Sequence, residues 1–151
     1  MQYNLLVIVL HRPFCAKRYI QPQPLVGKGP LHAREMCIRS AIEISNLISC
    51  YRTQYTLRRA SVQLVHVTFT AALILVYAII SGVMRDLYLD LSSHLDVCCQ
   101  ALADMGEAFE NSARALDILL AIKRSWQARM VSSFGGAASK KRAESHSSSQ
   151  V

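Results

Sequence analysis

Residues 1–19, MQYNLLVIVLHRPFCAKRY, decide how the rest of this chain is interpreted. The apolar run from Leu5 to Leu10 predicts a helix that is buried on almost all sides. Pro13 should stop this helix, because proline lacks a backbone N–H and disfavours helical backbone at the residue before it. The helix begins without a capping residue, so we expect it to belong to the middle of a larger helical domain.

A second and a third helix are expected after this segment. The second should begin near Pro30, since proline is favoured at the first helical position. The third should run from about Leu57 to Met84. Apolar residues at steps of three and four indicate that the second helix buries one stripe, which comprises Cys37, Ala41, Ile44, Ile48 and Tyr51.

A fourth and a fifth helix complete the predicted set. Ser92 or Ser93 is the expected N-cap of the fourth helix, since Ser93 is followed three residues later by Asp96 in a loose capping box, and Gly106 predicts the end of this helix. Asn111 is the expected N-cap of the fifth helix. One apolar stripe on that fifth helix comprises Ala115, Ile118, Leu119, Ile122, Trp126 and Met130.

No stretch of the sequence predicts a strand, so the expected fold class is all-α, with about five helices. Residues 1–131 should form a partial helical bundle. Residues 132–151, SSFGGAASKKRAESHSSSQV, contain little that a core could bury and are expected to be a disordered tail.

The net charge of +7 permits acidic partners, anionic membranes or nucleic acid, and it does not specify a fold. Part of the basic excess lies near the C-terminus, where Lys140, Lys141 and Arg142 form a candidate nuclear-import patch. The chain has five cysteines, an odd number, and no two of them form a Cys-x2-Cys pair. We interpret them as reduced, mostly buried thiols of an intracellular protein.

No pattern typical of catalysis occurs in the sequence, so no catalytic, cofactor-binding or metal-binding residues are assigned and an enzyme is not expected. The chain has no P-loop, no Gly-x-Gly-x-x-Gly and no Gly-x-Ser-x-Gly segment. His66 lies in an apolar run and is interpreted as a hydrogen-bonded core histidine.

The uncharged stretch Ala60–Met84 is long enough to cross a bilayer, so two interpretations of it are open. In one, it is the span of a small single-pass membrane protein. In the other, it is the buried helix of a globular domain, because Gln63, His66 and Thr70 share one polar face. We favour the buried helix.

The segment from Tyr3 to Phe14 resembles the Tyr-x-x-Leu-x-Ile-Leu-Leu-His-Arg-Pro-Phe segment in the regulatory domain of fungal binuclear zinc-cluster transcription factors. Later segments resemble that domain in the same order. They are Cys37, Ala41, Ile44 and Tyr51, then Ser61 to Ala72, then Leu102, Met105, Ala113, Leu116, Leu119 and Trp126. The resemblance covers residues 1 to about 130.

This resemblance implies a nuclear, all-helical regulatory domain that acts on transcription through contacts with protein partners, effectors or the rest of its own domain. The six-cysteine module that holds two zinc ions and binds DNA in that family has no counterpart among the five cysteines here. Zinc and DNA contact would therefore belong to an N-terminal module outside this sequence. The resemblance implies a fragment of such a factor, and the remaining alternative is a stand-alone helical interaction protein.

Overall fold

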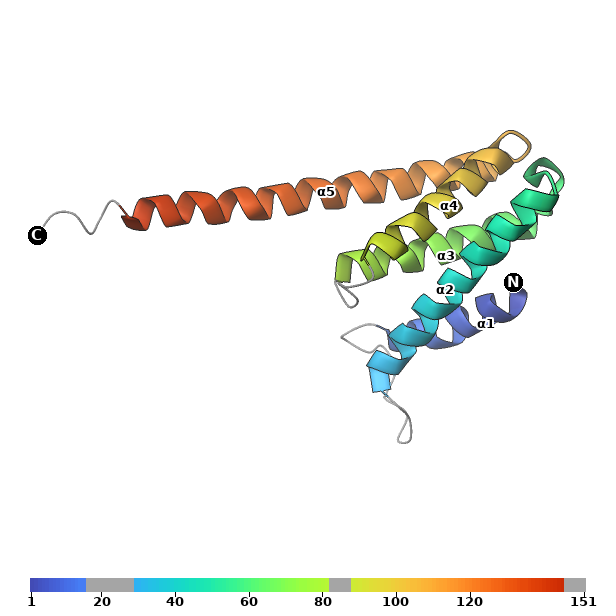
Figure 1. Ribbon diagram of the computed structural model, residues 1–151, viewed down its shortest axis with the longest axis horizontal. Helices are drawn as coiled ribbons and strands as arrows, with labels where there is room; N and C mark the ends of the chain where they lie inside the picture. The colour runs from blue at the N-terminus through green and yellow to red at the C-terminus, as the bar shows by residue number, and fades with distance from the viewer. Residues whose placement is uncertain (16–28, 82–87, 146–151) are drawn as a thin grey trace, which may run out of the picture. The chain divides into compact units, whose positions relative to one another are not determined.

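The computed structural model describes residues 1–15, 29–81 and 88–145, and these ranges contain helices and no strand. The five α-helices are α1 (Gln2–His11), α2 (Gly29–Gln54), α3 (Val62–Ser81), α4 (Tyr88–Gly106) and α5 (Glu110–Ser145) (Figure 1). Two short 3-10 helices, η1 (Arg12–Phe14) and η2 (Leu57–Arg59), follow α1 and α2. The predicted all-α class and the predicted number of helices are confirmed.

The chain divides into two units, Met1–Leu119 and Leu120–Val151. The first unit holds α1 to α4 and the start of α5. The second unit holds the rest of α5, whose backbone is helical as far as Ser145. The disorder of residues 132–151 stays a prediction. The sequence also predicted that the last helix ends near residue 131, whereas α5 ends at Ser145.

Helix α2 is central in the first unit, because it packs against α1, α3 and α4. Helices α3 and α4 also pack against each other. The predicted apolar stripe of α2 is confirmed at Cys37, Ala41, Ile44 and Ile48, which are all at most 1% exposed. Fully buried side chains from the neighbouring helices complete the core, among them Ile8, Leu75, Leu91, Leu102 and Met105.

Helix α1 differs from its prediction. Only Val7 and Ile8 of α1 are buried, whereas Leu6 and Leu10 are 59% and 67% exposed. The prediction of burial on almost all sides is therefore wrong for this chain. Composition alone suggested full burial, but among the described elements α1 packs mainly against α2, with fewer contacts to η1 and α3.

The third helix begins later than predicted. Residues 57–59 form η2, and Ala60 then adopts extended backbone with ψ 160°, so a continuous helix from Leu57 is wrong. Helix α3 starts at Val62, where the Ser61 carbonyl accepts the first bond from the Leu64 N–H at 2.9 Å. The predicted end at Met84 lies outside the described residues. His66 is exposed, which corrects its interpretation as a core histidine.

Helix α3 satisfies its buried hydroxyl groups internally. The Thr68 hydroxyl donates to the Leu64 carbonyl at 2.7 Å, and the Thr70 hydroxyl donates to the His66 carbonyl at 2.9 Å. Among the described helices, α3 is the one long and apolar enough to cross a membrane by length and composition. Half of its most apolar window is buried inside the protein.

Two predicted helix starts are wrong. Helix α4 begins at Tyr88, so the Ser93 capping box lies inside the helix, and α5 begins at Glu110, one residue before the expected cap Asn111. Capping side chains raise the chance of a helix start, but the surrounding packing decides where helical backbone begins. The predicted end of α4 at Gly106 is confirmed.

The α4–α5 junction is closely packed. The Ser112 hydroxyl, fully buried, donates to the Leu102 carbonyl at 2.7 Å. A Cβ at Gly106 would lie 3.5 Å from the Cβ of Ala113, which is ordinary contact. Salt bridges from Arg52 to Asp104 and from Arg58 to Glu107 join this end of α4 to α2 and η2.

Candidate functional site

The His-Arg-Pro-Phe segment forms a corner at the end of α1, which we define as residues 11–15 and name the HRPF corner. Pro13 lies in the 3-10 turn η1. The α-helix α1 ends just before this turn, at His11, as the presence of Pro13 predicts. The His11 Nδ1 lies 2.8 Å from the Val7 carbonyl, an acceptor, so Nδ1 carries the proton. The His11 ring also makes an edge contact with the His32 ring of α2, with centroids 6.3 Å apart.

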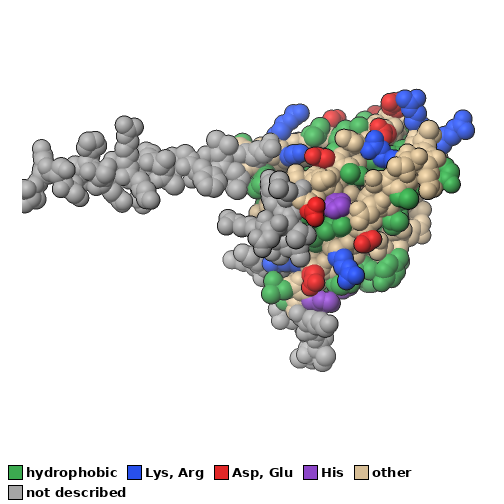
Figure 2. All heavy atoms as spheres, viewed as in Figure 1, with side chains coloured by type: hydrophobic (Ala, Val, Ile, Leu, Met, Phe, Trp, Pro, Cys, Tyr) green, Lys and Arg blue, Asp and Glu red, His purple; other side chains and the backbone are tan. Residues whose placement is uncertain are grey.

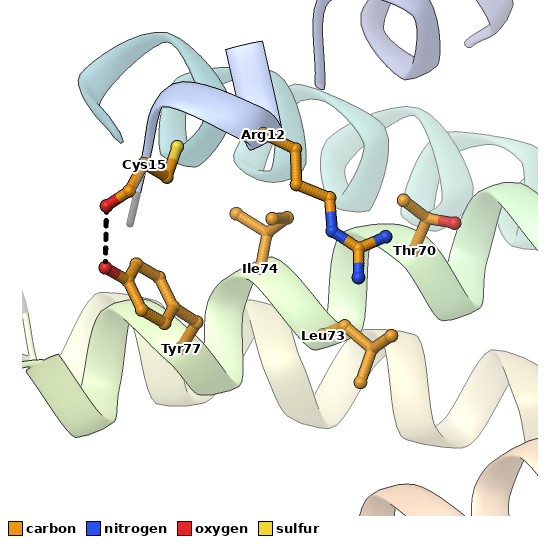
Figure 3. A pocket seen from close by; sticks show the side chains of 6 residues that line it. All are labelled: Arg12, Cys15, Thr70, Leu73, Ile74 and Tyr77. Atoms are coloured by element: carbon orange, nitrogen blue, oxygen red, sulfur yellow. Dashed lines mark hydrogen bonds between the residues drawn. The ribbon is translucent and has the colours of Figure 1, made fainter. Parts of the chain in front are cut away.

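One carbonyl group holds the HRPF corner to two other helices. The Cys15 carbonyl accepts a hydrogen bond from Arg34 Nε of α2 at 2.8 Å and another from the Tyr77 hydroxyl of α3 at 3.2 Å. Figure 3 shows the Tyr77 bond from the side of α3. Three helices that are far apart in sequence therefore meet at this single backbone group.

The thiol of the same residue points into the protein. Cys15 Sγ lies 3.5 Å from Cys37 Sγ of α2, and the two residues are 7% and 1% exposed. Further weak bonds link the Cys15 thiol to the His11 carbonyl at 3.4 Å and the Cys37 thiol to the Ile8 carbonyl at 3.8 Å. The two sulfur atoms are thus in van der Waals contact and both are free thiols.

Burial raises the pKa of the Cys37 thiol to about 12. The charge on a deprotonated Cys15 and the hydrogen bond between the two thiols raise the pKa of Cys37 as well, whereas the Arg12 guanidinium lowers it. Cys37 is therefore a protonated thiol at neutral pH.

A cavity of about 310 Å³ opens beside the corner, between η1 and α3. Its lining is mostly apolar, with Leu73 and Ile74 on the α3 side and Cys15 at one end (Figure 3). The Arg12 side chain extends from the corner across α3, with its guanidinium between Leu73 and Thr70 (Figure 3). A small polar or anionic molecule that entered this cavity would meet the positive charge of Arg12.

A second polar contact lies between α2 and α4. The buried Ser45 hydroxyl lies 3.2 Å from the His94 carbonyl and 3.2 Å from His94 Nδ1. The hydroxyl has one proton, which it donates to the carbonyl, so Nδ1–H donates to the hydroxyl oxygen. Burial also raises the pKa of the neighbouring Cys98 thiol to about 12. The hydrogen bonds of this group join α2 to α4.

The residues singled out from sequence fare differently in the structure. Lys140, Lys141 and Arg142 lie on the helical backbone of α5, and their side chains lie outside the described part. Within the described residues, no three His, Cys, Asp or Glu side chains form a group that could hold a metal ion. Sequence reasoning drew attention to the HRPF segment but missed the Cys15–Cys37 contact and the roles of Arg34 and Tyr77, which no spacing in the sequence signals.

Comparisons with protein families, with curated proteins and with solved structures find no match to this chain.

Proposed function

We propose that this chain is part of the regulatory domain of a fungal binuclear zinc-cluster transcription factor and that it controls transcription in the nucleus through protein contacts. The sequence support is the order of segments that resemble that domain, with the His-Arg-Pro-Phe segment first. In this proposal the chain has no catalytic role and makes no DNA contact of its own. Zinc would be bound only by the N-terminal module of the factor.

The observation that carries the proposal is the outer face of α1. Tyr3, Leu6 and Leu10 are 74%, 59% and 67% exposed, and their spacing places them on one side of the helix. Val9, beside them, is 53% exposed. We call these four residues the α1 outer face. Contiguous apolar surface of this kind on a soluble domain is typical of a contact site.

The occupant that we propose for the α1 outer face is a helix from an upstream part of the same regulatory domain. Ile8, with no exposure, lies on the opposite side of α1, which packs against α2. A helix packed on the outer face would then make α1 buried on both sides, which is what its sequence pattern predicts.

The experiment that tests the family assignment is to read the genomic sequence upstream of Met1. Helix-forming sequence in the same frame, preceded by a six-cysteine zinc-binding pattern, would support the proposal. Unrelated sequence with stop codons in that frame would refute it.

The role of the α1 outer face can be tested separately by sedimentation of the purified chain. We expect wild type to self-associate and the double variant Leu6→Gln, Leu10→Gln to be a monomer with unchanged helix content. Ile8→Gln, at a fully buried position, should instead unfold the chain. A monomeric wild type would favour the stand-alone helical interaction protein.

Import through Lys140, Lys141 and Arg142 is part of the proposal. A tagged chain should accumulate in the nucleus, and replacement of these three residues by Ala should shift it to the cytoplasm. Unchanged nuclear accumulation of that variant would refute the assigned patch.

The alternative function, a small single-pass membrane protein, is favoured by one observation. Helix α3 has the length and apolar composition of a span. Fractionation of a tagged chain distinguishes the two proposals, since alkali or high salt releases a peripheral protein and leaves a spanning protein in the membrane. Retention in the alkali-washed membrane would refute the proposed regulatory role.

A further inference from the structure

The two thiols at the HRPF corner are placed for a reaction with each other. Their sulfur atoms are 3.5 Å apart, and a disulfide bond of about 2.05 Å requires an approach of about 1.5 Å. Cys15 directly follows the single turn η1, and Cys37 lies in α2, which packs against that turn. The required approach is thus a small movement of a short turn rather than a rearrangement of the bundle.

The cavity beside the corner is lined by the residue that carries one of these thiols. Cys15 lines the cavity of about 310 Å³, and this volume exceeds the share of about 30 Å³ that one water molecule occupies in the liquid. Hydrogen peroxide is only slightly larger than water. Cys37 is 1% exposed and does not line the cavity.

We propose that Cys15 and Cys37 are a redox-active dithiol that forms an internal disulfide with hydrogen peroxide. The thiolate of Cys15 attacks one peroxide oxygen, the O–O bond breaks, and the leaving hydroxide takes up a proton to become water. Cys15 is then a sulfenic acid. The sulfur of Cys37 attacks the Cys15 sulfur, the S–O bond breaks, and the released hydroxide takes the Cys37 proton. Two thiols are oxidised and one peroxide is reduced to two water molecules.

The surroundings assign different roles to the two thiols. Cys15 lines the cavity and Cys37 does not, so we assign Cys15 as the thiol that meets the oxidant. Cys37 stays protonated and shielded until the sulfenic acid forms 3.5 Å away. The disulfide would join η1 covalently to α2 and fix the end of α1. This inference does not depend on the proposed function.

Peptide mapping of the folded wild-type chain tests the proposal directly. Trypsin does not cut between Arg12 and Pro13, so Cys15 is released in residues 1–17 and Cys37 in residues 35–39. Cys50 is released in residues 40–52, and Cys98 with Cys99 in residues 86–114. After treatment with hydrogen peroxide and blocking of the remaining thiols, we expect the linked pair 1–17 with 35–39 as the main disulfide product, and its loss on reduction.

The same treatment of the chain unfolded in urea is the control. Without the fold, loop closure favours the shorter separation between Cys37 and Cys50 over that between Cys15 and Cys37. The ratio of the two linked pairs should therefore change by about tenfold or more between the folded and the unfolded chain, as thiols held in contact react at a far higher effective concentration. An unchanged ratio, or a folded product dominated by Cys50, would overturn the proposal.

Single substitutions give a second test. Cys15→Ser and Cys37→Ser should each abolish the peroxide-induced disulfide, whereas Cys50→Ser, at an exposed thiol, should leave it intact. Trapping with dimedone should detect a sulfenic acid at Cys15 in the Cys37→Ser variant. A sulfenic acid at Cys37 in the Cys15→Ser variant, formed at the same rate, would contradict the assigned roles.

Discussion

Replacing Tyr77 by Phe and Arg34 by Met, singly and together, measures how the HRPF corner is held. Both side chains donate to the Cys15 carbonyl, at 3.2 Å and 2.8 Å. Each single substitution removes one donor and keeps most of the apolar part of the side chain. The double substitution leaves the carbonyl of a residue that is 7% exposed without either donor.

The expected costs follow from this shared acceptor. Tyr77→Phe should lower the free energy of unfolding by about 0.5–1.5 kcal/mol, since a neutral hydrogen bond is lost while Arg34 still donates to the Cys15 carbonyl. Arg34→Met should lower the free energy of unfolding by about 1.5–3 kcal/mol, because the lost hydrogen bond has a charged donor. The double variant should cost about 1–3 kcal/mol more than the sum, which is the penalty for an unsatisfied buried acceptor.

Urea unfolding followed by far-UV circular dichroism gives these free energies, provided that the slope with denaturant is the same for all variants. Tyr55→Phe is the matched control, because Tyr55 is 59% exposed and its change should stay within about 0.5 kcal/mol. Strictly additive costs in the double variant would refute the reasoning. They would mean that water replaces both donors and that the corner is not held by this carbonyl.

Three further predictions concern the core, one glycine and the buried thiols. Ile44→Ala, at a position with no exposure, should cost about 2–5 kcal/mol in urea unfolding, and an equal cost for the partly exposed Leu47→Ala would contradict this placement of the core. Gly29 has φ +76° with open space around its missing Cβ, so Gly29→Ala should cost about 1–2 kcal/mol through backbone strain alone, whereas Gly106→Ala should be nearly neutral or stabilising in the same assay. The pKa of each of the thiols Cys37 and Cys98 is raised from 9.0 to about 12 in the folded chain, so the unfolded chain loses these protons first as pH rises. Stability should therefore be constant up to pH about 9 and then fall by about 1.4 kcal/mol per pH unit for each thiol; Cys98→Ala should halve that slope, and an unchanged slope would contradict the assignment.

Periodicity in the sequence was sufficient for the fold class and for part of the core. The apolar residues from Cys37 to Ile48 recur at helical spacing. Such a pattern predicts which side of the helix is buried, because the apolar side chains themselves favour burial of that side. The end of α4 at Gly106 was predictable for a similar local reason.

Helix starts and the exposure of α1 were not predictable, because they depend on neighbours. Ser93 has the side chain of a cap, yet the packing of α4 continues helical backbone back to Tyr88. Leu6 and Leu10 resemble core residues, and their exposure follows from where the remaining helices lie.

The candidate site was predictable only in part. The His-Arg-Pro-Phe segment was noticed because its residue types are unusual in sequence. The contact between Cys15 and Cys37 joins residues separated by an irregular stretch, and the Tyr77 bond crosses from α3. Long-range contacts of this kind leave no periodic trace in a single sequence, so only the folded chain reveals them.

Helix α3 has a consequence for how the chain is synthesised. It is the most apolar helix described, and α4, which packs along it, ends about 25 residues later in the chain. At about 5–20 residues per second, the ribosome makes α3 about 1–5 s before α4 is complete. During that interval α4 is not yet present to shield α3. We therefore expect nascent chains stalled with α3 outside the ribosome and α4 still inside it to be bound by chaperones or signal recognition particle, and chains stalled with both helices outside to be released from them.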